Sequence, residues 1–359
     1  MMLKNVTWRG VLRRIKNTVP GLDRAWALSK RALALSYRGR MLSEVLRFND
    51  TTEVNDLPGI AHYWSNTYLR PLLEEHGVSH PEAFFARYLG EGMRRCGEHD
   101  PVFLSIGAGN CDTEIRVARL LRDAGIARFT IECLDVNAEM LARGRAAAQA
   151  EGLDSHLAFS RGDFNLWRPQ RRYASVMANQ SLHHVVRLEH LFDAVKESLL
   201  PGAFFVACDM IGRNGHQRWP EALAAVHAFW QELPPAYTWN RQLSRFEQPF
   251  ANWDNSREGF EGIRAQDILP LLLERFHFHL FIGVANVVDV FIDRAFGHHF
   301  DPARPWDREF IDRVHAYDEA GFRAGTLTPT RMFAVMATDA APVRRVARGL
   351  TPEASVRRP

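Results

Sequence analysis

The chain has 359 residues, of which 46% are hydrophobic and 24% are charged. This globular composition excludes a disordered, collagen-like or coiled-coil chain, and no apolar run approaches the roughly 18 residues of a membrane-spanning helix. The net charge of +3 is uneven: residues 1–50 carry +8, residues 340–359 carry +4 and the body between them carries −9. An acidic body does not suit a nucleic-acid-binding face, so no nucleic-acid partner is expected.

The four cysteines form no C-x-x-C pair, so the sequence shows neither a zinc nor a redox signature. The N-terminus has no apolar core followed by a small-residue cleavage site, so it does not resemble a secretory signal. We therefore expect a cytoplasmic protein. Residues 1–50 look helical, basic and amphipathic, which leaves open a peripheral position at the inner membrane face.

A helical block over residues 62–97 precedes the first clear strand, and we interpret residues 51–100 as a helical lid. Apolar runs then alternate with helical periodicity, which predicts a parallel sheet covered on both faces. The expected strands are 102–106, 129–134, 157–159, 173–178 and 203–208. The expected helices between them are 114–123, 138–150 and 188–199.

Residues 213–262 break the alternation and are too long for an ordinary connection, so we expect a functional, α-rich cap insert there. Residues 263–339 complete the core, with strands expected at 276–282 and 332–336. The predicted fold class is α/β: a doubly wound, mostly parallel, seven-stranded Rossmann-like sheet. Residues 101–212 form its cofactor-binding part, and residues 340–359 are expected to be a basic flexible tail.

Three loops after predicted strands carry the candidate site. Gly107 and Gly109, with Ala108 between them, allow a tight turn and close approach of a ligand to the backbone. Asp135, followed by Val136, ends the second strand, where an acid can accept hydrogen bonds from both ribose hydroxyls of a nucleoside. After the third strand, an acid and an aromatic ring suit the adenine amino group and the ring face. These two residues are Asp163 and Phe164.

Residues 101–210 resemble a class I S-adenosylmethionine (SAM) dependent methyltransferase of the small-molecule type, in particular uncharacterised bacterial members. Five motifs carry the resemblance. They are Ile106-Gly-Ala-Gly109, Leu134-Asp-Val-Asn-Ala-Glu-Met-Leu141, Gly162-Asp-Phe164, Asn179-Gln-Ser-Leu-His-His184 and Leu200-Pro-Gly-Ala203. The resemblance implies SAM as cofactor, Asn179 among the cofactor-binding residues, and methyl transfer to a small-molecule or glycan-type acceptor, with oxygen as the expected site.

The chain departs from the family pattern at two positions. Ser105 stands where the family often has an acid, and Cys111 stands where it often has a third glycine. An acid near the methionine amino group then has to come from elsewhere, and Asp112 and Glu114 are the candidates. Two alternatives stay open: an NAD(P)-dependent oxidoreductase on a similar sheet, and a non-catalytic SAM-binding or assembly protein.

His183 and His184 follow the fourth strand, beside the expected methyl position, and we predict that one of them takes the acceptor's proton, with His183 favoured. No metal is expected, because the His-His pairs and His277-x-His279 lack a ligand spacing with acids. The lid and the insert supply the predicted acceptor-binding residues. They are Tyr63, Trp64, Arg218, Trp219, Trp253, Asp254, Glu258 and Arg264. Acceptor identity and oligomeric state do not follow from the sequence.

Overall fold

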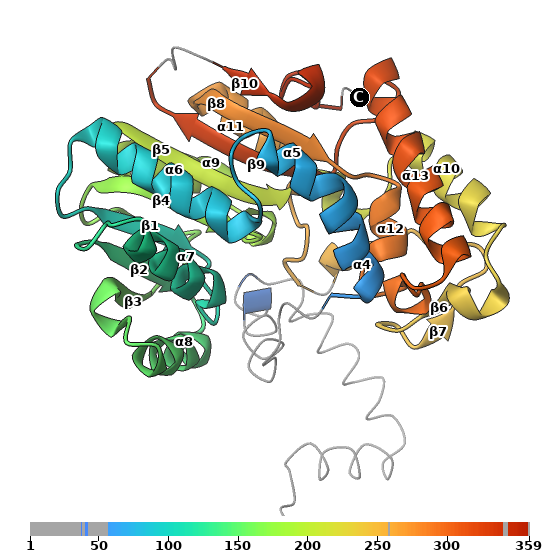
Figure 1. Cartoon of the computed structure of the whole chain (residues 1–359), viewed down its shortest axis with the longest axis horizontal. Coiled ribbons are helices and arrows are strands. Elements are labelled where there is room, and N and C mark those ends of the chain that lie inside the picture. Colours follow the sequence, from blue (N-terminus) through green and yellow to red (C-terminus); the bar gives the residue numbers. More distant parts are fainter. Residues whose placement is uncertain (1–36, 38–39, 42–56, 258, 340–343, 358–359) are drawn as a thin grey trace, which may run out of the picture.

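The structure is a computed structural model that describes residues 37, 40–41, 57–257, 259–339 and 344–357. Eight strands form its main sheet in the order β10-β8-β9-β5-β4-β1-β2-β3 (Figure 1). All neighbouring strands in this sheet are parallel except β9, which runs antiparallel to β5 and β8. The bounds are β1 Val102–Ile106, β2 Thr130–Asp135, β3 Leu157–Arg161, β4 Tyr173–Asn179, β5 Leu199–Met210, β8 His277–Val284, β9 Arg331–Ala337 and β10 Arg345–Val346.

Helices connect β1 to β2, β2 to β3 and β4 to β5, and further helices precede β1 and follow β5. The bounds are α4 Gly59–Trp64, α5 Arg70–Glu74, α6 Pro81–Cys96, α7 Asp112–Asp123, α8 Ala138–Ala150, α9 Leu188–Ser198, α10 Pro220–Trp230, α11 Ala265–Arg275, α12 Val288–Ile292 and α13 Pro305–Ala324. A short hairpin pairs β6 (Trp239–Asn240) with β7 (Arg245–Phe246). Among the described helices, none is long and apolar enough to cross a membrane.

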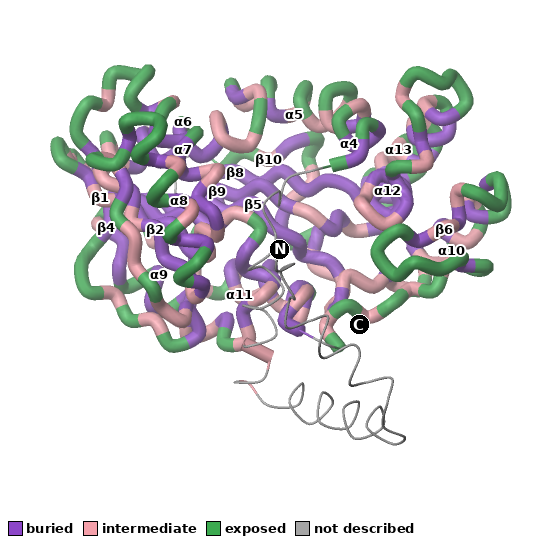
Figure 2. The backbone as a smooth tube through the Cα atoms, turned by 90° about the horizontal axis from the view of Figure 1, so that it is seen from below, coloured by how far each residue is buried: buried purple, intermediate pink, exposed green. Residues whose placement is uncertain are grey.

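Two apolar layers pack on the two faces of the sheet. One layer contains the buried sides of α6, α7 and α8, and the other contains those of α9 and α11. Figure 2 shows the buried strands running through the middle of the molecule between these helices. The prediction of a doubly wound, mostly parallel α/β sheet is therefore confirmed, and the seven expected strands are all present.

The eighth strand, β10, differs from the expectation. Arg345 and Val346 pair in parallel with Leu280 and Phe281 of β8, within a segment that we predicted as a flexible tail. The segment is held by packing and by ion pairs, because Ala347 is buried, Arg348 pairs with Glu319 and Arg357 pairs with Glu221. A two-residue edge strand has too little hydrophobic periodicity to be recognised in the sequence.

The strand order reverses between β1 and β4, since the chain moves outward through β2 and β3 and then returns to the other side of β1. In open parallel sheets, ligands bind at the carboxyl ends of the strands at this switch point. The loops after β1, β2, β3 and β4 all lie at this carboxyl edge. The predicted cofactor and catalytic residues come from these four loops.

Candidate functional site at the carboxyl edge of the sheet

The turn after β1 has the backbone conformation that its glycines predict. Gly107 has a φ of 72°, and a Cβ atom there would lie 2.4 Å from the Cβ of Ser181 in the loop after β4. The N–H groups of Gly107 and Ala108 both donate to the carbonyl of Leu134 at the end of β2. Glycine at position 107 is therefore required both by the positive φ and by the close approach of two loops at the switch point.

Asp135 joins the turn after β1 to the loop after β2. Its Oδ2 accepts a hydrogen bond from the N–H of Gly109 at 2.9 Å, and its Oδ1 accepts one from the N–H of Asn137 at 2.8 Å. Burial raises the pKa of this carboxyl, while the two N–H donors act in the opposite direction. Each carboxylate oxygen has two lone pairs, so each can accept one further hydrogen bond from a ligand.

Glu114 supplies the carboxyl group that Ser105 lacks at the end of β1. The Ser105 hydroxyl donates to Glu114 Oε1 at 2.6 Å, and both side chains are buried. Burial raises the pKa of Glu114 to about 7. Glu114 Oε2 is buried and accepts no hydrogen bond from the described residues. Of the two acids considered in place of Ser105, Glu114 is thus the one that lies beside it.

Asp163 after β3 is in contact with the N-terminal part of the chain. The Tyr37 hydroxyl donates to Asp163 Oδ2 at 2.5 Å. The centroid of the Tyr37 ring lies 5.6 Å from that of the Phe260 ring. Asp163 Oδ1 accepts from the N–H of Asn165 at 2.9 Å. Phe164 is 8% exposed and belongs to the apolar layer that includes Leu134.

Two further predicted cofactor residues are tied to neighbouring elements. Asn179 at the end of β4 donates through its side-chain nitrogen to the Thr113 hydroxyl at 3.0 Å, which places it at the start of α7. Val136 packs partly buried on the same apolar layer as Leu134. Val136 directly follows Asp135, and Asn179 is the last residue of β4, so both lie at the carboxyl edge of the sheet.

Asp209, at the end of β5, shapes the loop that carries the two histidines. It is fully buried, and its Oδ2 accepts hydrogen bonds from the N–H groups of Ser181 (2.9 Å) and Leu182 (2.7 Å). Its Oδ1 lies 2.6 Å from Nδ1 of His183. One carboxylate therefore fixes both the backbone of this loop and the orientation of the His183 ring.

Both nitrogens of His183 face carboxylates. Nδ1 faces Asp209, and Nε2 lies 3.5 Å from Oε1 of Glu261. Burial lowers the pKa of His183, but the two carboxylates outweigh burial and raise it to about 10. The imidazole is therefore protonated at neutral pH and donates to both acids.

Glu261 gathers three histidines at the end of the insert. His216 Nε2 lies 2.9 Å from Glu261 Oε1, and His184 Nε2 lies 3.8 Å from Oε2. Burial opposes ionisation of Glu261, but hydrogen bonds from His183 and His216 hold the pKa of its carboxyl well below the usual range. The side chain of His184 is more exposed than that of His183, at 16% against 6%.

Tyr63 and Trp64 of α4 point to α13 and not to this edge. The Tyr63 hydroxyl donates to the carboxylate of Asp312, and Trp64 Nε1 donates to His315 Nδ1 at 3.4 Å. α4 lies against α13 in Figure 1. The structure therefore does not bring these two aromatic residues to the predicted cofactor site.

Arg218 and Trp219 have partners within the protein. Arg218 is buried and donates to the carbonyl of Asn286 at 2.7 Å and to that of His216 at 3.3 Å. The guanidinium groups of Arg213 and Arg357 lie over the Trp219 ring. Their central carbons are 5.3 and 4.5 Å from the ring centroid. By donating to the His216 carbonyl, Arg218 holds the backbone of His216 in place, so Arg218 is a positioning residue.

The remaining predicted acceptor residues are divided between ion pairs and the surface. Trp253 is 38% exposed beneath the guanidinium of Arg257, and Asp254 accepts from the backbone and hydroxyl of Ser256. Arg264 forms two hydrogen bonds of 2.7 Å with Glu189, which tie the start of α11 to that of α9. Glu258 lies outside the described residues.

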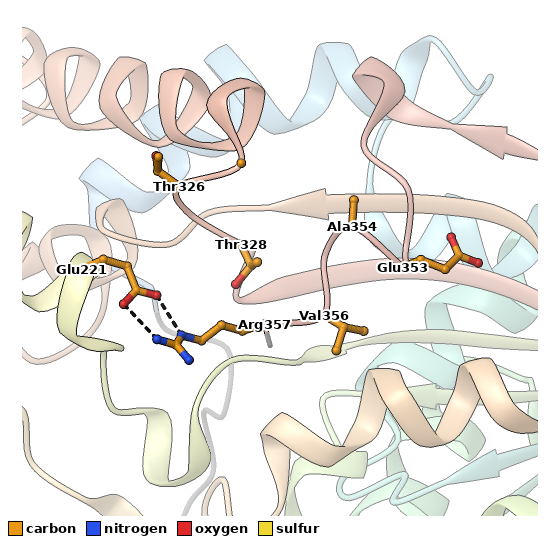
Figure 3. Close-up of a pocket in the computed structure, with 8 residues that line it drawn as sticks. Glu221, Thr326, Thr328, Glu353, Ala354, Val356 and Arg357 are labelled. Atoms are coloured by element: carbon orange, nitrogen blue, oxygen red, sulfur yellow. Dashed lines mark hydrogen bonds and ion pairs between the residues drawn. The ribbon is translucent and has the colours of Figure 1, made fainter. Parts of the chain in front are cut away.

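A surface pocket of about 430 Å³ lies elsewhere, next to the C-terminal segment. Figure 3 shows Arg357 and Glu221 meeting across it in an ion pair, with Nε 2.9 Å from Oε1. Thr326 and Thr328 complete part of its wall. None of the candidate cofactor or histidine residues lines this pocket, so we do not assign the chemistry to it.

Two of the site residues above were absent from the predicted set: Asp209 and His216. Asp209 directly follows the apolar strand expected at 203–208, which is the same signal that identifies Asp135. His216 and Glu261 carry no local signal, because they lie at opposite ends of the insert and meet only in the folded chain.

No protein-family model and no curated protein matches the chain. Among solved structures, it is similar to the O-methyltransferase of a trans-AT polyketide synthase from Brevibacillus brevis, in complex with S-adenosyl-L-homocysteine, at 12% identity. That match covers 80% of this chain and 83% of the other, with a TM-score of 0.39. A putative sarcosine dimethylglycine methyltransferase from Galdieria sulphuraria shares 14% identity over 70% of this chain and 84% of its own, with a TM-score of 0.39.

The cyclase SpnF is also similar, at 13% identity over 80% of this chain and all of its own, with a TM-score of 0.40. A fold does not by itself determine a reaction, so the chemistry of this site follows from its own residues at the sheet edge.

Proposed function

We propose that the protein is a SAM-dependent methyltransferase that methylates a small-molecule or glycan-type acceptor, at an oxygen atom. The observation that carries this proposal is Asp135, a buried carboxylate at the switch point of the sheet. Its two oxygens are oriented by Gly109 and Asn137 and each retains a lone pair. Two adjacent ribose hydroxyls are suited to that pair of acceptors.

The neighbouring residues fit the rest of the cofactor. Asp163 already accepts a hydrogen bond from a donor in the structure, the Tyr37 hydroxyl, and an adenine amino group is a donor of the same kind. Glu114 lies beside the turn after β1 with one carboxyl oxygen unsatisfied, where the cationic end of the methionine moiety supplies a compensating charge. Gly107 and Gly109 keep side chains out of this turn.

When bound, SAM supplies a methyl group on a sulfonium, so the methyl–sulfur bond breaks as the acceptor oxygen bonds the methyl, and the sulfur keeps the electron pair. The protein's task is to hold the acceptor in line and to take its proton. We assign His184 as the base that takes the acceptor's proton, because its side chain is more exposed than that of His183. His183 is instead held between Asp209 and Glu261 and keeps the loop in place.

Glu261 completes this arrangement from the insert. Its Oε2 is 3.8 Å from His184 Nε2, which places the carboxylate beside the proposed base. The N–H of Ile263 donates to the carbonyl of His183 at 3.1 Å, which fastens the end of the insert to the histidine loop. This contact supports the proposal that the insert, residues 213–262, faces the acceptor.

Calorimetry of the full chain with SAM and, separately, with NAD tests the proposal. We expect binding of SAM and of S-adenosyl-L-homocysteine and none of NAD. Binding of NAD alone would identify an oxidoreductase, and binding of neither would leave a non-catalytic assembly role. A methyl-transfer screen with labelled SAM against sugars, nucleotide sugars, lipids and phenols then identifies the acceptor. SAM binding without transfer to any acceptor class would contradict the enzymatic part of the proposal.

A further inference from the structure

Three side chains at the carboxyl edge have the composition and spacing of a metal site. We propose that His183, His216 and Glu261 bind a divalent transition-metal ion, with Asp209 as a positioning residue behind His183. One nitrogen from each histidine and one oxygen of Glu261 all lie within 4.8 Å of one another. Within the described part of the chain, this is the one group of His, Cys, Asp and Glu that meets that spacing.

The distances between the ligand atoms match those around a metal ion. Protein nitrogen and oxygen ligands lie about 2.0–2.2 Å from zinc, so neighbouring ligands are about 3.0 Å apart in an octahedron and about 3.4 Å apart in a tetrahedron. In the structure, Glu261 Oε1 is 2.9 Å from His216 Nε2 and 3.5 Å from His183 Nε2. The nitrogens of His183 and His216 lie within 4.8 Å of each other, so we infer that a small rotation of the side chains brings all three ligand atoms around one ion.

Asp209 gives His183 the second contact that metal-binding histidines usually have. Its Oδ1 accepts from Nδ1 at 2.6 Å, which directs Nε2 towards Glu261. Arg218 holds only the backbone of His216, by donating to its carbonyl oxygen, and Nδ1 of His216 neither accepts nor donates a hydrogen bond among the described residues. Asp209 and Glu261 face the two nitrogens of His183, and a divalent ion would take the place of the proton that Nε2 otherwise holds beside Glu261.

The donor set selects the class of ion. Two imidazole nitrogens and one carboxylate oxygen suit Zn²⁺, Fe²⁺ or Co²⁺, whereas Mg²⁺ prefers oxygen ligands throughout. Three protein ligands leave at least one position open for water or another molecule. The Glu261 side chain is 24% exposed and that of His216 is 14% exposed, so an ion and an acceptor atom can reach the site from solvent.

The open position suggests what the ion does, and this step rests on the proposed function. A bound ion acts as a Lewis acid. It holds the oxygen of an acceptor hydroxyl beside His184 and favours loss of the proton from that hydroxyl. The O–H bond breaks with the electron pair left on oxygen, and the proton goes to His184. The binding of the ion itself depends only on the three ligands and does not require that SAM binds.

The test uses the full chain without a histidine tag, freed of metal and titrated with Co²⁺ and Zn²⁺. We expect one equivalent of Co²⁺ to bind and to give the visible absorption of a low-coordinate nitrogen–oxygen site. Zn²⁺ should displace it. Glu261→Gln and His216→Ala should each weaken binding at least about tenfold, and Asp209→Asn should weaken it by about 10- to 100-fold. His62→Ala, an exposed histidine on α4, serves as the matched control and should bind as the wild type does.

A gain of signal covers the case in which a variant does not fold. His216→Cys retains a ligand and should add an intense thiolate-to-cobalt charge-transfer band. Absence of that band in a folded protein, or equal Co²⁺ binding by wild type, Glu261→Gln and His216→Ala, would overturn the proposal. SAM calorimetry on the metal-free protein separates the two proposals: SAM binding without a Co²⁺ site refutes only the metal site, and a Co²⁺ site without SAM binding refutes only the proposed function.

Discussion

Replacing Asp135 by asparagine is the most direct test of the cofactor site. The substitution keeps the size of the side chain, removes its charge and turns one acceptor oxygen into an NH₂ donor. Because Oδ1 and Oδ2 each accept from a backbone N–H, either orientation of the new amide places its nitrogen against the N–H of Gly109 or of Asn137. The amide therefore cannot reproduce the contacts of the carboxylate.

The expected loss follows from the number of hydrogen bonds. A hydrogen bond to a charged group contributes about 1.5–3 kcal/mol, so weakening two bonds to the ribose hydroxyls costs about 3 kcal/mol. At 1.4 kcal/mol for each factor of ten, SAM should bind Asp135→Asn about a hundredfold more weakly than the wild type. S-adenosyl-L-homocysteine should show the same loss, since it carries the same ribose.

Titration calorimetry with both ligands measures this loss, and thermal unfolding shows whether the variant remains folded. Asp154→Asn is the matched control, because Asp154 is an exposed acid at the start of a short helical turn. Dissociation constants for a folded Asp135→Asn protein within about threefold of the wild-type values would refute the assignment of the ribose to Asp135.

Three further outcomes are expected. Glu114 is buried with its pKa raised to about 7, so the folded protein retains a proton there that the unfolded chain loses near pH 4.5. Stability therefore falls by about 3 kcal/mol as the pH rises from about 4.5 to 7. Urea unfolding of Glu114→Gln should lack this fall, and an identical pH dependence in both proteins would contradict it. Tyr37→Phe frees Asp163 and should tighten SAM binding by about two- to tenfold in calorimetry; weaker binding would instead make Tyr37 part of the cofactor site. His184→Ala should lower kcat by about 10²–10⁴-fold in a labelled-methyl assay while the affinity for SAM is retained, and an unchanged kcat would remove His184 as the base.

The proposed cofactor half of the site is predictable from the sequence because its signals are local. Gly107 and Gly109 directly follow the first apolar strand, and Asp135 directly ends the second. In a parallel sheet, all carboxyl ends meet at one edge, so residues that end different strands become neighbours by construction. Strand periodicity therefore carries both the fold class and the position of these residues.

Local sequence does not decide which acid takes the place of the one missing at position 105. The sequence shows that the acid is missing at position 105, and it leaves Asp112 and Glu114 as candidates. The choice depends on which face of α7 lies on β1, and packing places Glu114 inward, 2.6 Å from the Ser105 hydroxyl.

The histidine cluster is decided by tertiary structure alone. His216 and Glu261 lie in segments with no common motif, and the chain between them, which contains α10 and the β6–β7 hairpin, has no pattern that predicts their contact. Their meeting with His183 depends on hydrogen bonds such as that from Ile263 to the His183 carbonyl and on the buried Arg218 beside His216. Such long-range contacts result from the packing of the whole chain, whereas strand ends and glycine turns are properties of a few adjacent residues.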